Sequence, residues 1–193
     1  MPVPRLAPSR CALLVIDLQE RMMPTIHDAD ATITNTVAMI EIARLLSIPI
    51  LATEQYTKGL GRSVPAIANA LPSDATVFEK TQFSAIVPEV DAALRRLDRP
   101  DILLCGVETH ICILQTTLDL LASGRQPILI SDAVSSSEPT QANHAIRRAE
   151  RCGALTSGVL SASYELMQDA SHQAFRSILT VVKARKLPAS DLA

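Results

Sequence analysis

The stretch "ILLCGVETHICILQT", residues 102–116, contains both a candidate strand and a candidate helix. It opens as a continuous apolar run, turns at Gly106, and then places polar side chains and Cys112 ahead of a renewed apolar pattern. A run of this kind is typical of a strand that is buried on both faces in a parallel sheet. The stretch therefore predicts a strand, a turn that carries a nucleophile, and a helix.

The same alternation extends along the rest of the chain. Besides the run over 101–107, apolar runs that predict strands lie at 11–17, 48–53, 75–81 and 126–133, with a weaker one in 154–160. Amphipathic patterns that predict helices lie at 30–46, 87–97, 112–122 and 139–152. Strands that alternate with helices indicate βαβ units. We predict one α/β domain over residues 1–193, with three α/β/α layers around a mostly parallel sheet of roughly six strands.

Near the C-terminus four apolar residues recur at helical spacing. They are Phe175, Ile178, Leu179 and Val182. A stripe of this kind marks the buried face of an amphipathic helix. We expect it to pack on the sheet of its own chain, and an oligomer interface is the alternative.

Composition excludes several classes of protein. Hydrophobic residues make up 48% of the 193 residues and charged residues 20%, which is typical of a globular domain. No apolar run approaches the roughly 18 residues of a membrane span, and the N-terminal residues lack the apolar segment of a secretory signal. The formal net charge of −2 and the absence of Trp give no basis for nucleic-acid binding. We predict a small-molecule substrate, with no nucleic-acid and no membrane partner.

The four cysteines indicate a reduced protein. Cys11, Cys105, Cys112 and Cys152 form no CxxC pair and have no CxxH spacing. Three of them, all but Cys112, lie in apolar surroundings, where a free cysteine acts as a small hydrophobe. We therefore predict a cytoplasmic location, no disulfide framework, no metal and no cofactor.

The segment "EQYTKGLGRS", residues 54–63, is the longest ambiguous loop. Two glycines beside basic residues suggest a phosphate loop, but the segment matches neither GxxxxGK[ST] nor GxGxxG. A binding or lid loop is the better interpretation. The missing glycine fingerprints also argue against a nucleotide-binding α/β protein.

Three reactive side chains fall at the predicted carboxyl ends of strands, where open α/β sheets bind ligands. They are Asp17, Lys80 and Cys112. Each alone has an ordinary interpretation as a turn, surface or packing residue. Together they supply a thiol nucleophile, a carboxylate that can accept its proton, and an ammonium. A helix N-terminus and an ammonium both lower a thiol pKa, so we expect the pKa of Cys112 to lie well below the usual value of about 8.5.

A histidine base for Cys112 is the alternative. His110 lies two positions from Cys112, and residues with that spacing do not face each other on a helix. His27, His144 and His172 are scattered along the chain. The spacing therefore disfavours a Cys–His dyad.

Four segments resemble the isochorismatase-like hydrolase superfamily, and most closely its small isochorismatase-domain proteins. They are "LLVIDLQ" (13–19), "TEQYTKGLG" (53–61), "FEKTQFSA" (78–85) and "LLCGVETHICILQT" (103–116). The resemblance implies a Rossmann-like topology and a catalytic triad of Asp17, Lys80 and Cys112. It also implies a cis peptide at Val107–Glu108, with the backbone N–H groups of Glu108 and Cys112 as the oxyanion hole.

The chain departs from some members of that superfamily. Nicotinamidases carry an Asp-x-His metal pair after the second strand, where this chain has Gln55 and Thr57. Neutral amide and hydroxyl groups are poor ligands for a transition metal, so a metal-dependent nicotinamidase is disfavoured. Members that cleave isochorismate generally lack the cysteine, and Cys112 therefore argues against that reaction.

The sequence thus favours a metal-independent cysteine hydrolase that cleaves an amide-like C–N bond of a small molecule through a thioester. Gln55, Tyr56 and Phe83 are the candidate substrate-binding residues. We expect a homo-oligomer. The alternative is a non-catalytic protein that keeps the fold as an interaction or redox-sensing scaffold, with Cys112 as an oxidation site.

Overall fold

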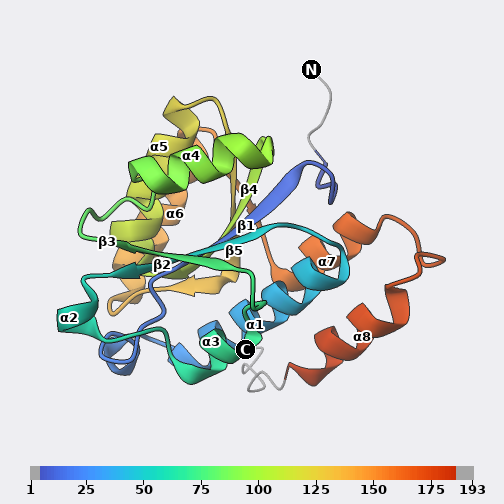
Figure 1. The fold of residues 1–193 in the computed structure, drawn as a ribbon, viewed down its shortest axis with the longest axis horizontal. Coiled ribbons are helices and arrows are strands. Elements are labelled where there is room, and N and C mark those ends of the chain that lie inside the picture. The colour runs from blue at the N-terminus through green and yellow to red at the C-terminus, as the bar shows by residue number, and fades with distance from the viewer. Residues whose placement is uncertain (1–4, 186–193) are drawn as a thin grey trace.

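The computed structural model describes residues 5–185, and its centre is a six-stranded sheet whose neighbouring strands are all parallel (Figure 1). The strands are β1 (Cys11–Ile16), β2 (Ile50–Gln55), β3 (Thr76–Lys80), β4 (Asp101–Val107), β5 (Gln126–Ser135) and β6 (Leu155–Ser157). Their order in the sheet is β3-β2-β1-β4-β5-β6. The direction of winding reverses between β1 and β4, which opens a crevice at the carboxyl ends of these two strands. The predicted α/β fold is confirmed.

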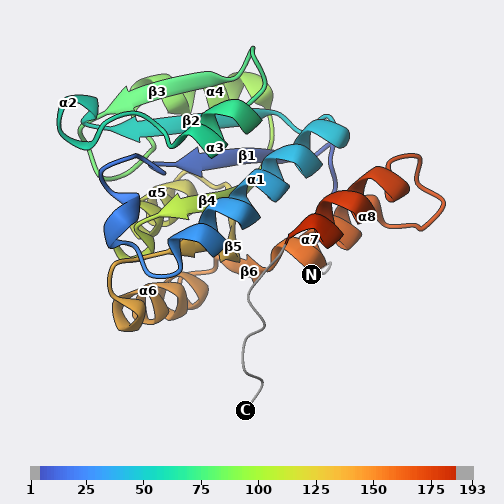
Figure 2. The same cartoon turned by 90° about the horizontal axis from the view of Figure 1, so that it is seen from below.

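Helices cover both faces of the sheet (Figure 2). One face carries α4 (Pro88–Leu97), α5 (Leu114–Ala122) and α6 (Pro139–Arg151). The other carries α1 (Ala29–Leu45), α3 (Pro65–Ala70), α7 (Val159–Met167) and α8 (Phe175–Ala184). Alternate residues of each strand point to opposite faces, so β1 sends Leu13 to the α1 side and Leu14 to the α4 side. Both are fully buried, which explains the continuous apolar runs.

The ends of several elements differ from the sequence prediction. β2 continues to Gln55, and the predicted loop after it contains the short helix α2 (Thr57–Leu60). In 154–160 the strand has three residues, and Val159 already begins α7, a helix that the sequence did not predict. The carboxylate of Asp132 in β5 accepts the Val159 N–H at 2.8 Å. That cap comes from a distant strand, so the local pattern does not show it.

The C-terminal apolar stripe packs mainly against two helices of its own chain. Ile178 is fully buried, and α8 makes its main contacts with α1 and α7. Helix α1 covers the central strands on that face, and Ile178 belongs to the same buried cluster as residues of α1, α7 and the sheet. The stripe therefore faces the chain's own core, as expected, with α1 and α7 as its principal partners.

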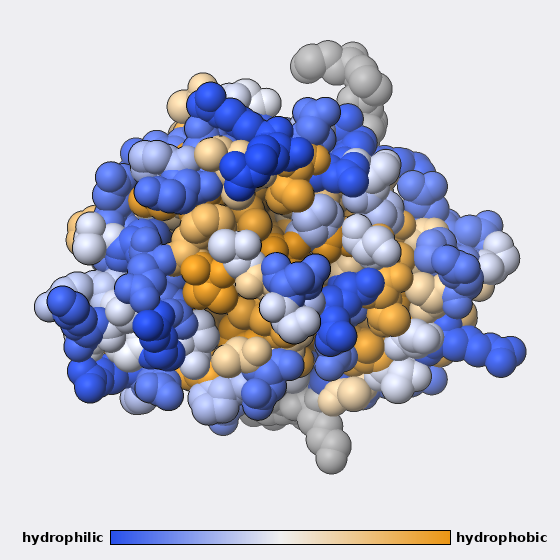
Figure 3. Space-filling view, in the orientation of Figure 1, coloured by the Kyte–Doolittle hydropathy of each residue, from blue (hydrophilic) through white to orange (hydrophobic). Residues whose placement is uncertain are grey.

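The outer edge of β3 is the most apolar part of the surface shown in Figure 3. Apolar side chains gather there between α4 and the helices α1 and α3. Val77 of β3 is 41% exposed. Within residues 5–185, no helix has both the length and the apolar character that crossing a bilayer requires.

Gly106 is required by the packing of β4 against β1. Its φ is +129°, and a Cβ atom at this position would lie 2.0 Å from the backbone oxygen of Ile16. That contact is with backbone, which cannot rotate away. The glycine therefore allows the two strands that flank the crevice to approach each other.

We predict that Gly106→Ala lowers the free energy of unfolding by more than about 2 kcal/mol, because β1 and β4 must separate to admit the methyl group. Gly124→Ala is the matched control. Gly124 has a φ of +79°, and a Cβ added there would have no heavy atom within 4 Å, so this variant loses about 1–2 kcal/mol through backbone strain. Urea unfolding of both variants measures the difference. Equal losses would show that close packing at Gly106 contributes nothing.

Candidate active site

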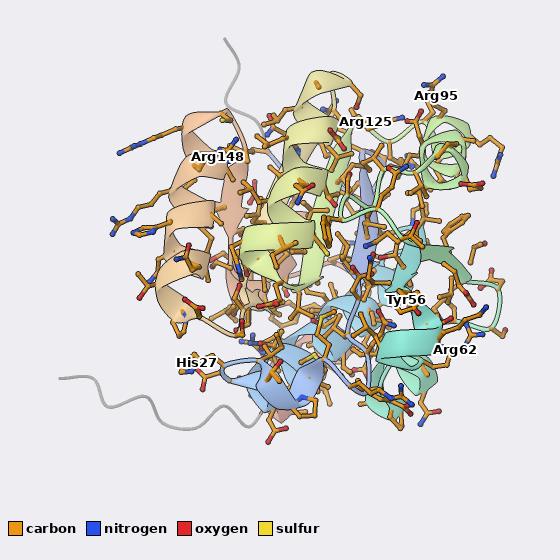
Figure 4. All side chains as sticks on the ribbon, turned by 90° about the vertical axis from the view of Figure 1, so that its left-hand side faces the viewer. His27, Tyr56, Arg62, Arg95, Arg125 and Arg148 are labelled. Atoms are coloured by element: carbon orange, nitrogen blue, oxygen red, sulfur yellow. The ribbon has the colours of Figure 1, made fainter. Side chains whose placement is uncertain are left out.

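The predicted site residues meet at the edge of the sheet where the strands end. Asp17 follows β1, Lys80 ends β3, and Cys112 lies in the turn after β4. Figure 4 faces this edge, with Tyr56 and Arg62 beside α2 on one side and His27 on the other. The three residues are 0%, 5% and 4% exposed, respectively. The structure thus assembles, out of solvent, three side chains that are far apart in the sequence.

The ammonium of Lys80 is surrounded by oxygen atoms. Its Nζ lies 2.6 Å from Asp17 Oδ2 and 2.8 Å from Gln55 Oε1. It also lies 3.2 Å from each of the backbone oxygens of Gln82 and Phe83. The sulfur of Cys112 is further away, at 3.9 Å. An ammonium has three protons, so these four oxygens engage all of them. The shortest contacts of the Lys80 ammonium are therefore with oxygens, among them those of Asp17 and of the segment 80–83.

Asp17 is held in an unusual backbone conformation. Its φ is +57°, in the left-handed region that side chains rarely adopt. Its Oδ1 accepts a hydrogen bond of 2.8 Å from the hydroxyl of Thr53, and its Oδ2 accepts the hydrogen bond from Lys80. The negative charge of this carboxylate also raises the pKa of the Cys112 thiol. Asp17 is therefore the centre of the group.

Cys112 lies in a π-helix, not in the first turn of an α-helix as predicted. The π-helix η2 (Thr109–Ile113) precedes α5, and the Ile113 N–H donates to the Glu108 oxygen at 3.2 Å. The preceding peptide bond, Val107–Glu108, is cis. Single π-turns of this kind are frequent at functional sites.

Burial, together with the negative charge of Asp17, raises the pKa of the Cys112 thiol to about 12, and the positive charge of Lys80 opposes this rise. The predicted low thiol pKa is therefore wrong. The sequence placed an ammonium near the sulfur but could not show that the ammonium is paired with a carboxylate in a closed site. The resting group combines a neutral thiol with an Asp17–Lys80 ion pair.

The candidate substrate-binding residues occupy different positions. Gln55 is 8% exposed, and its amide is used by Lys80 and by the Thr81 oxygen, to which it donates at 2.8 Å. Tyr56 and Phe83 are 55% and 54% exposed at the rim. A groove of about 460 Å³ lies beside Tyr56, and its lining includes Tyr56, Lys80 and Val87 but not Phe83. Gln55 thus holds Lys80, whereas Tyr56 lines the approach to it.

Glu108 and His110 connect the turn to the loop after β5. The Glu108 carboxylate accepts hydrogen bonds from the N–H of Ser137 at 2.7 Å and from its hydroxyl at 2.6 Å. His110 Nδ1 lies 2.9 Å from the Ser136 hydroxyl. These contacts fix the turn that carries Cys112. They account for both side chains without a role for His110 as a base.

Sequence reasoning missed Thr53 and Gln19. Gln19 is fully buried, donates to the backbone oxygens of Gln55 and Gly61, and accepts from the Gln55 N–H. It thereby joins the end of β2 to the loop after α2. Both residues lie inside quoted motifs, "LLVIDLQ" and "TEQYTKGLG". Each is a polar residue two positions from a predicted site residue, Asp17 or Gln55, and that was the available signal.

No group of three or more His, Cys, Asp or Glu side chains is placed to hold a metal ion within residues 5–185. At the two positions where nicotinamidases carry their metal pair, the side chains are otherwise engaged. Gln55 contacts Lys80, and the Thr57 hydroxyl donates to Glu79 Oε2 at 3.0 Å. The donor set here therefore suits an ion pair.

A parallel α/β/α sheet with a buried Cys, Asp and Lys at the carboxyl ends of its strands defines a class of Rossmann-like proteins. The model of the isochorismatase domain matches residues 11–159. The chain belongs to the isochorismatase family. Members of this family are hydrolases, which supports the general interpretation of an enzyme.

Two relatives match nearly the whole chain. The secreted isochorismatase effector Isc1 of Phytophthora sojae is 39% identical, over 93% of this chain and 87% of its own length. Isochorismatase domain-containing protein 2A of Mus musculus is 36% identical, over 93% of this chain and 85% of its own length. Both support the predicted resemblance to small isochorismatase-domain proteins.

Solved structures match the fold. The MAR1 ribonuclease of Caenorhabditis elegans superposes with a TM-score of 0.92 at 34% identity, over 98% of this chain and 97% of that one. The YcaC protein of Escherichia coli, described as an octameric hydrolase of unknown specificity, superposes with a TM-score of 0.83 at 20% identity, over 95% of this chain and 98% of that one. The second likeness concerns the fold alone.

We predict that iodoacetamide alkylates Cys112 slowly, at a rate with no titration step between about pH 7 and 9, because the thiol stays protonated in that range. Above that range the rate rises with pH as the thiolate forms. Asp17→Asn removes the base, and it also removes the negative charge that opposes formation of the Cys112 thiolate. It should lower the rate at neutral pH by at least about tenfold and move the upper rise to lower pH.

The measurement is peptide mass spectrometry in a Cys152→Ser background, since Cys152 is the exposed thiol among the described residues. A wild-type rate that rises with a midpoint at about pH 8.5, the pKa of a free thiol, and then levels off would contradict the closed site.

Proposed function

We propose that this protein is a metal-independent cysteine hydrolase that cleaves an amide-like C–N bond of a small molecule through a thioester. The observation that carries the proposal is the buried Lys80 ammonium, whose Nζ lies 2.6 Å from the Asp17 carboxylate and 3.9 Å from the Cys112 sulfur, so that the three groups meet out of solvent. A nucleophile beside a base, with the base oriented by a third group, is the arrangement that nucleophilic catalysis requires.

In the first step Cys112 Sγ attacks the carbonyl carbon while its proton passes to Asp17. The negative charge moves to the carbonyl oxygen, where the backbone N–H groups of Glu108 and Cys112 stabilise it. Both N–H groups belong to the turn that carries the sulfur, since Glu108 caps η2 and Cys112 lies within it. Stabilisation by one such donor is worth about 10²–10³ in rate.

Collapse of this intermediate breaks the C–N bond, and Asp17 returns its proton to the leaving nitrogen. The acyl group then remains on Cys112 as a thioester. Water attacks the thioester as Asp17 takes one of its protons, the acid leaves, and the proton returns to the sulfur. The same carboxylate serves as base and acid in both halves of the reaction.

In this mechanism Lys80 acts mainly on Asp17. It stays paired with the carboxylate at 2.6 Å, which balances the negative charge of the base inside a buried site. It also donates to the Cys112 sulfur at 3.9 Å, where its positive charge opposes the rise in the thiol pKa and favours the developing thiolate. The pairing with Asp17 is thus added to the effect on the thiol that the sequence suggested.

The substrate is proposed to be small and uncharged at the reacting carbon. The triad residues are almost fully buried, and the Lys80 ammonium is already engaged by four oxygens. A charge next to the scissile bond would therefore lose its water without gaining a partner. The groove beside Tyr56 offers room for the rest of the molecule.

A ribonuclease is the second candidate, because the MAR1 relative is described as one. Against it stand the formal net charge of −2 and the burial of the triad, which a polyanionic strand would have to reach. A scaffold or redox sensor built on Cys112 is the non-catalytic alternative. An RNA cleavage assay with wild type and Cys112→Ala tests the ribonuclease. Oxidation of the Cys112 thiol without turnover of any substrate would identify the scaffold or redox sensor.

Two further expectations remain predictions. A cytoplasmic location is supported by four cysteines that are all free thiols, although one relative is named a secreted effector. A homo-oligomer is supported by exposed apolar side chains such as Val77 and Phe83. Sedimentation velocity of the purified chain measures the second expectation directly.

We predict that wild-type protein, incubated with a panel of small primary amides and the matching esters, yields an acyl adduct on Cys112 whose mass equals the acyl group. Lys80→Met and Asp17→Asn should lower the acylation rate by about 10²–10⁴, since each removes the ionised base. Intact-protein mass spectrometry after acid quench measures the adduct.

Cys152→Ser is the control and should leave acylation unchanged, because Cys152 is exposed and outside the site. Turnover of a panel member by Cys112→Ala at the wild-type rate would contradict the thioester mechanism.

A further inference from the structure

We propose that Thr53 is a positioning residue that fixes the orientation of the Asp17 carboxylate toward Cys112. The proposal rests on the proposed function, in which Asp17 accepts the thiol proton. It concerns how the base is held rather than which residue is the base.

Thr53 contacts Asp17 at two points. Its backbone oxygen accepts the Asp17 N–H at 3.1 Å, and its hydroxyl donates to Asp17 Oδ1 at 2.8 Å. Thr53 lies in β2 directly beside Ile16, the last residue of β1. It is 1% exposed, so water cannot replace either contact. The neighbouring strand β2 therefore hydrogen-bonds to both the backbone and the side chain of Asp17.

Asp17 needs such support because it lies outside regular structure. β1 ends at Ile16, and the positive φ of Asp17 turns the chain away from the sheet. Lys80 holds Oδ2 from β3, on one side of the carboxylate. With Oδ2 alone held, the carboxylate could still rotate about its bond to Cβ. The hydroxyl of Thr53 on Oδ1 stops that rotation.

The two held oxygens still leave room for a proton. Each carboxylate oxygen has two lone pairs, and the two donors occupy one on each. The groups that face this carboxylate are the Lys80 ammonium from β3, the Thr53 hydroxyl from β2 and the Cys112 thiol from η2. A free lone pair therefore remains for the thiol proton in a fixed direction.

Threonine suits this position for two reasons. A β-branched side chain favours a strand and has few rotamers, so the hydroxyl direction is defined by the backbone of β2. A hydroxyl that donates to a carboxylate also favours the ionised form of that carboxylate. Removal of the hydroxyl should therefore take one donor away from the Asp17 carboxylate and let it lose its alignment.

The test is the pH dependence of Cys112 alkylation by iodoacetamide, followed by peptide mass spectrometry in the Cys152→Ser background. We expect the alkylation rate to fall toward acid pH, which gives the profile an acid limb. In Thr53→Val, which is nearly isosteric, this acid limb should move to higher pH by about one unit. Thr53→Ser keeps the hydroxyl and should restore the wild-type position. Thr53→Ala should shift the limb in the same direction as Thr53→Val.

Thr36→Val is the matched control. Thr36 is fully buried, and its hydroxyl donates to the backbone oxygen of Ala133, remote from Asp17. This variant should lose stability in urea without moving the acid limb. A limb that stays in place in Thr53→Val and Thr53→Ala, or that moves equally in Thr53→Ser, would overturn the proposal.

The alkylation readout is independent of substrate turnover. If the limb moves as expected but no amide or ester is acylated, the positioning role stands and the proposed function fails. If acylation is found but the limb does not respond to loss of the hydroxyl, the proposed function stands and the positioning role fails.

Discussion

The buried ion pair between Lys80 and Asp17 determines what the carboxyl edge of this sheet can do. Both side chains are fully excluded from solvent, and their charged atoms lie 2.6 Å apart. Removing water from two charges is costly, and removal of either partner would leave an uncompensated buried charge at a cost of about 3–5 kcal/mol. The pair persists because further oxygens surround the ammonium and a hydroxyl donates to the carboxylate. The nucleophile therefore lies against a base whose charge is already balanced.

The sheet brings these groups together through its strand order. Asp17 follows β1 and Cys112 follows β4, the adjacent strands at which the winding reverses. Lys80 reaches the same point from β3, which lies two strands from β1. Gln55 at the end of β2 accepts a hydrogen bond from the Lys80 ammonium and so holds it at this edge. Gly106 lets β4 approach β1, and the contacts of Glu108 and His110 with the loop after β5 fix the turn that holds Cys112. The site thus depends on packing contacts from five of the six strands.

Much of this arrangement could be predicted from the sequence, because it follows from local patterns. The continuous apolar runs and the amphipathic segments gave the α/β fold, and the polar residues after the runs gave Asp17, Lys80 and Cys112 as neighbours. What could not be predicted depends on contacts between distant segments. The start of α7 is set by Asp132, and the protonation of Cys112 is set by burial together with Asp17. Gln55 looked like a pocket wall because its partner, the Lys80 ammonium, is 25 residues away in the chain.

The protonation state of the resting site is the most direct test of the proposed mechanism. Infrared difference spectroscopy at neutral pH, comparing wild type with Cys112→Ala and with Asp17→Asn, shows which group holds the proton. We predict an S–H stretching band that is lost in Cys112→Ala, and an ionised-carboxylate band that is lost in Asp17→Asn. The absence of the S–H band, together with a protonated-carboxyl band that disappears in Asp17→Asn, would show that the proton has already moved to Asp17. That result would contradict the proposed neutral thiol beside a charge-balanced base.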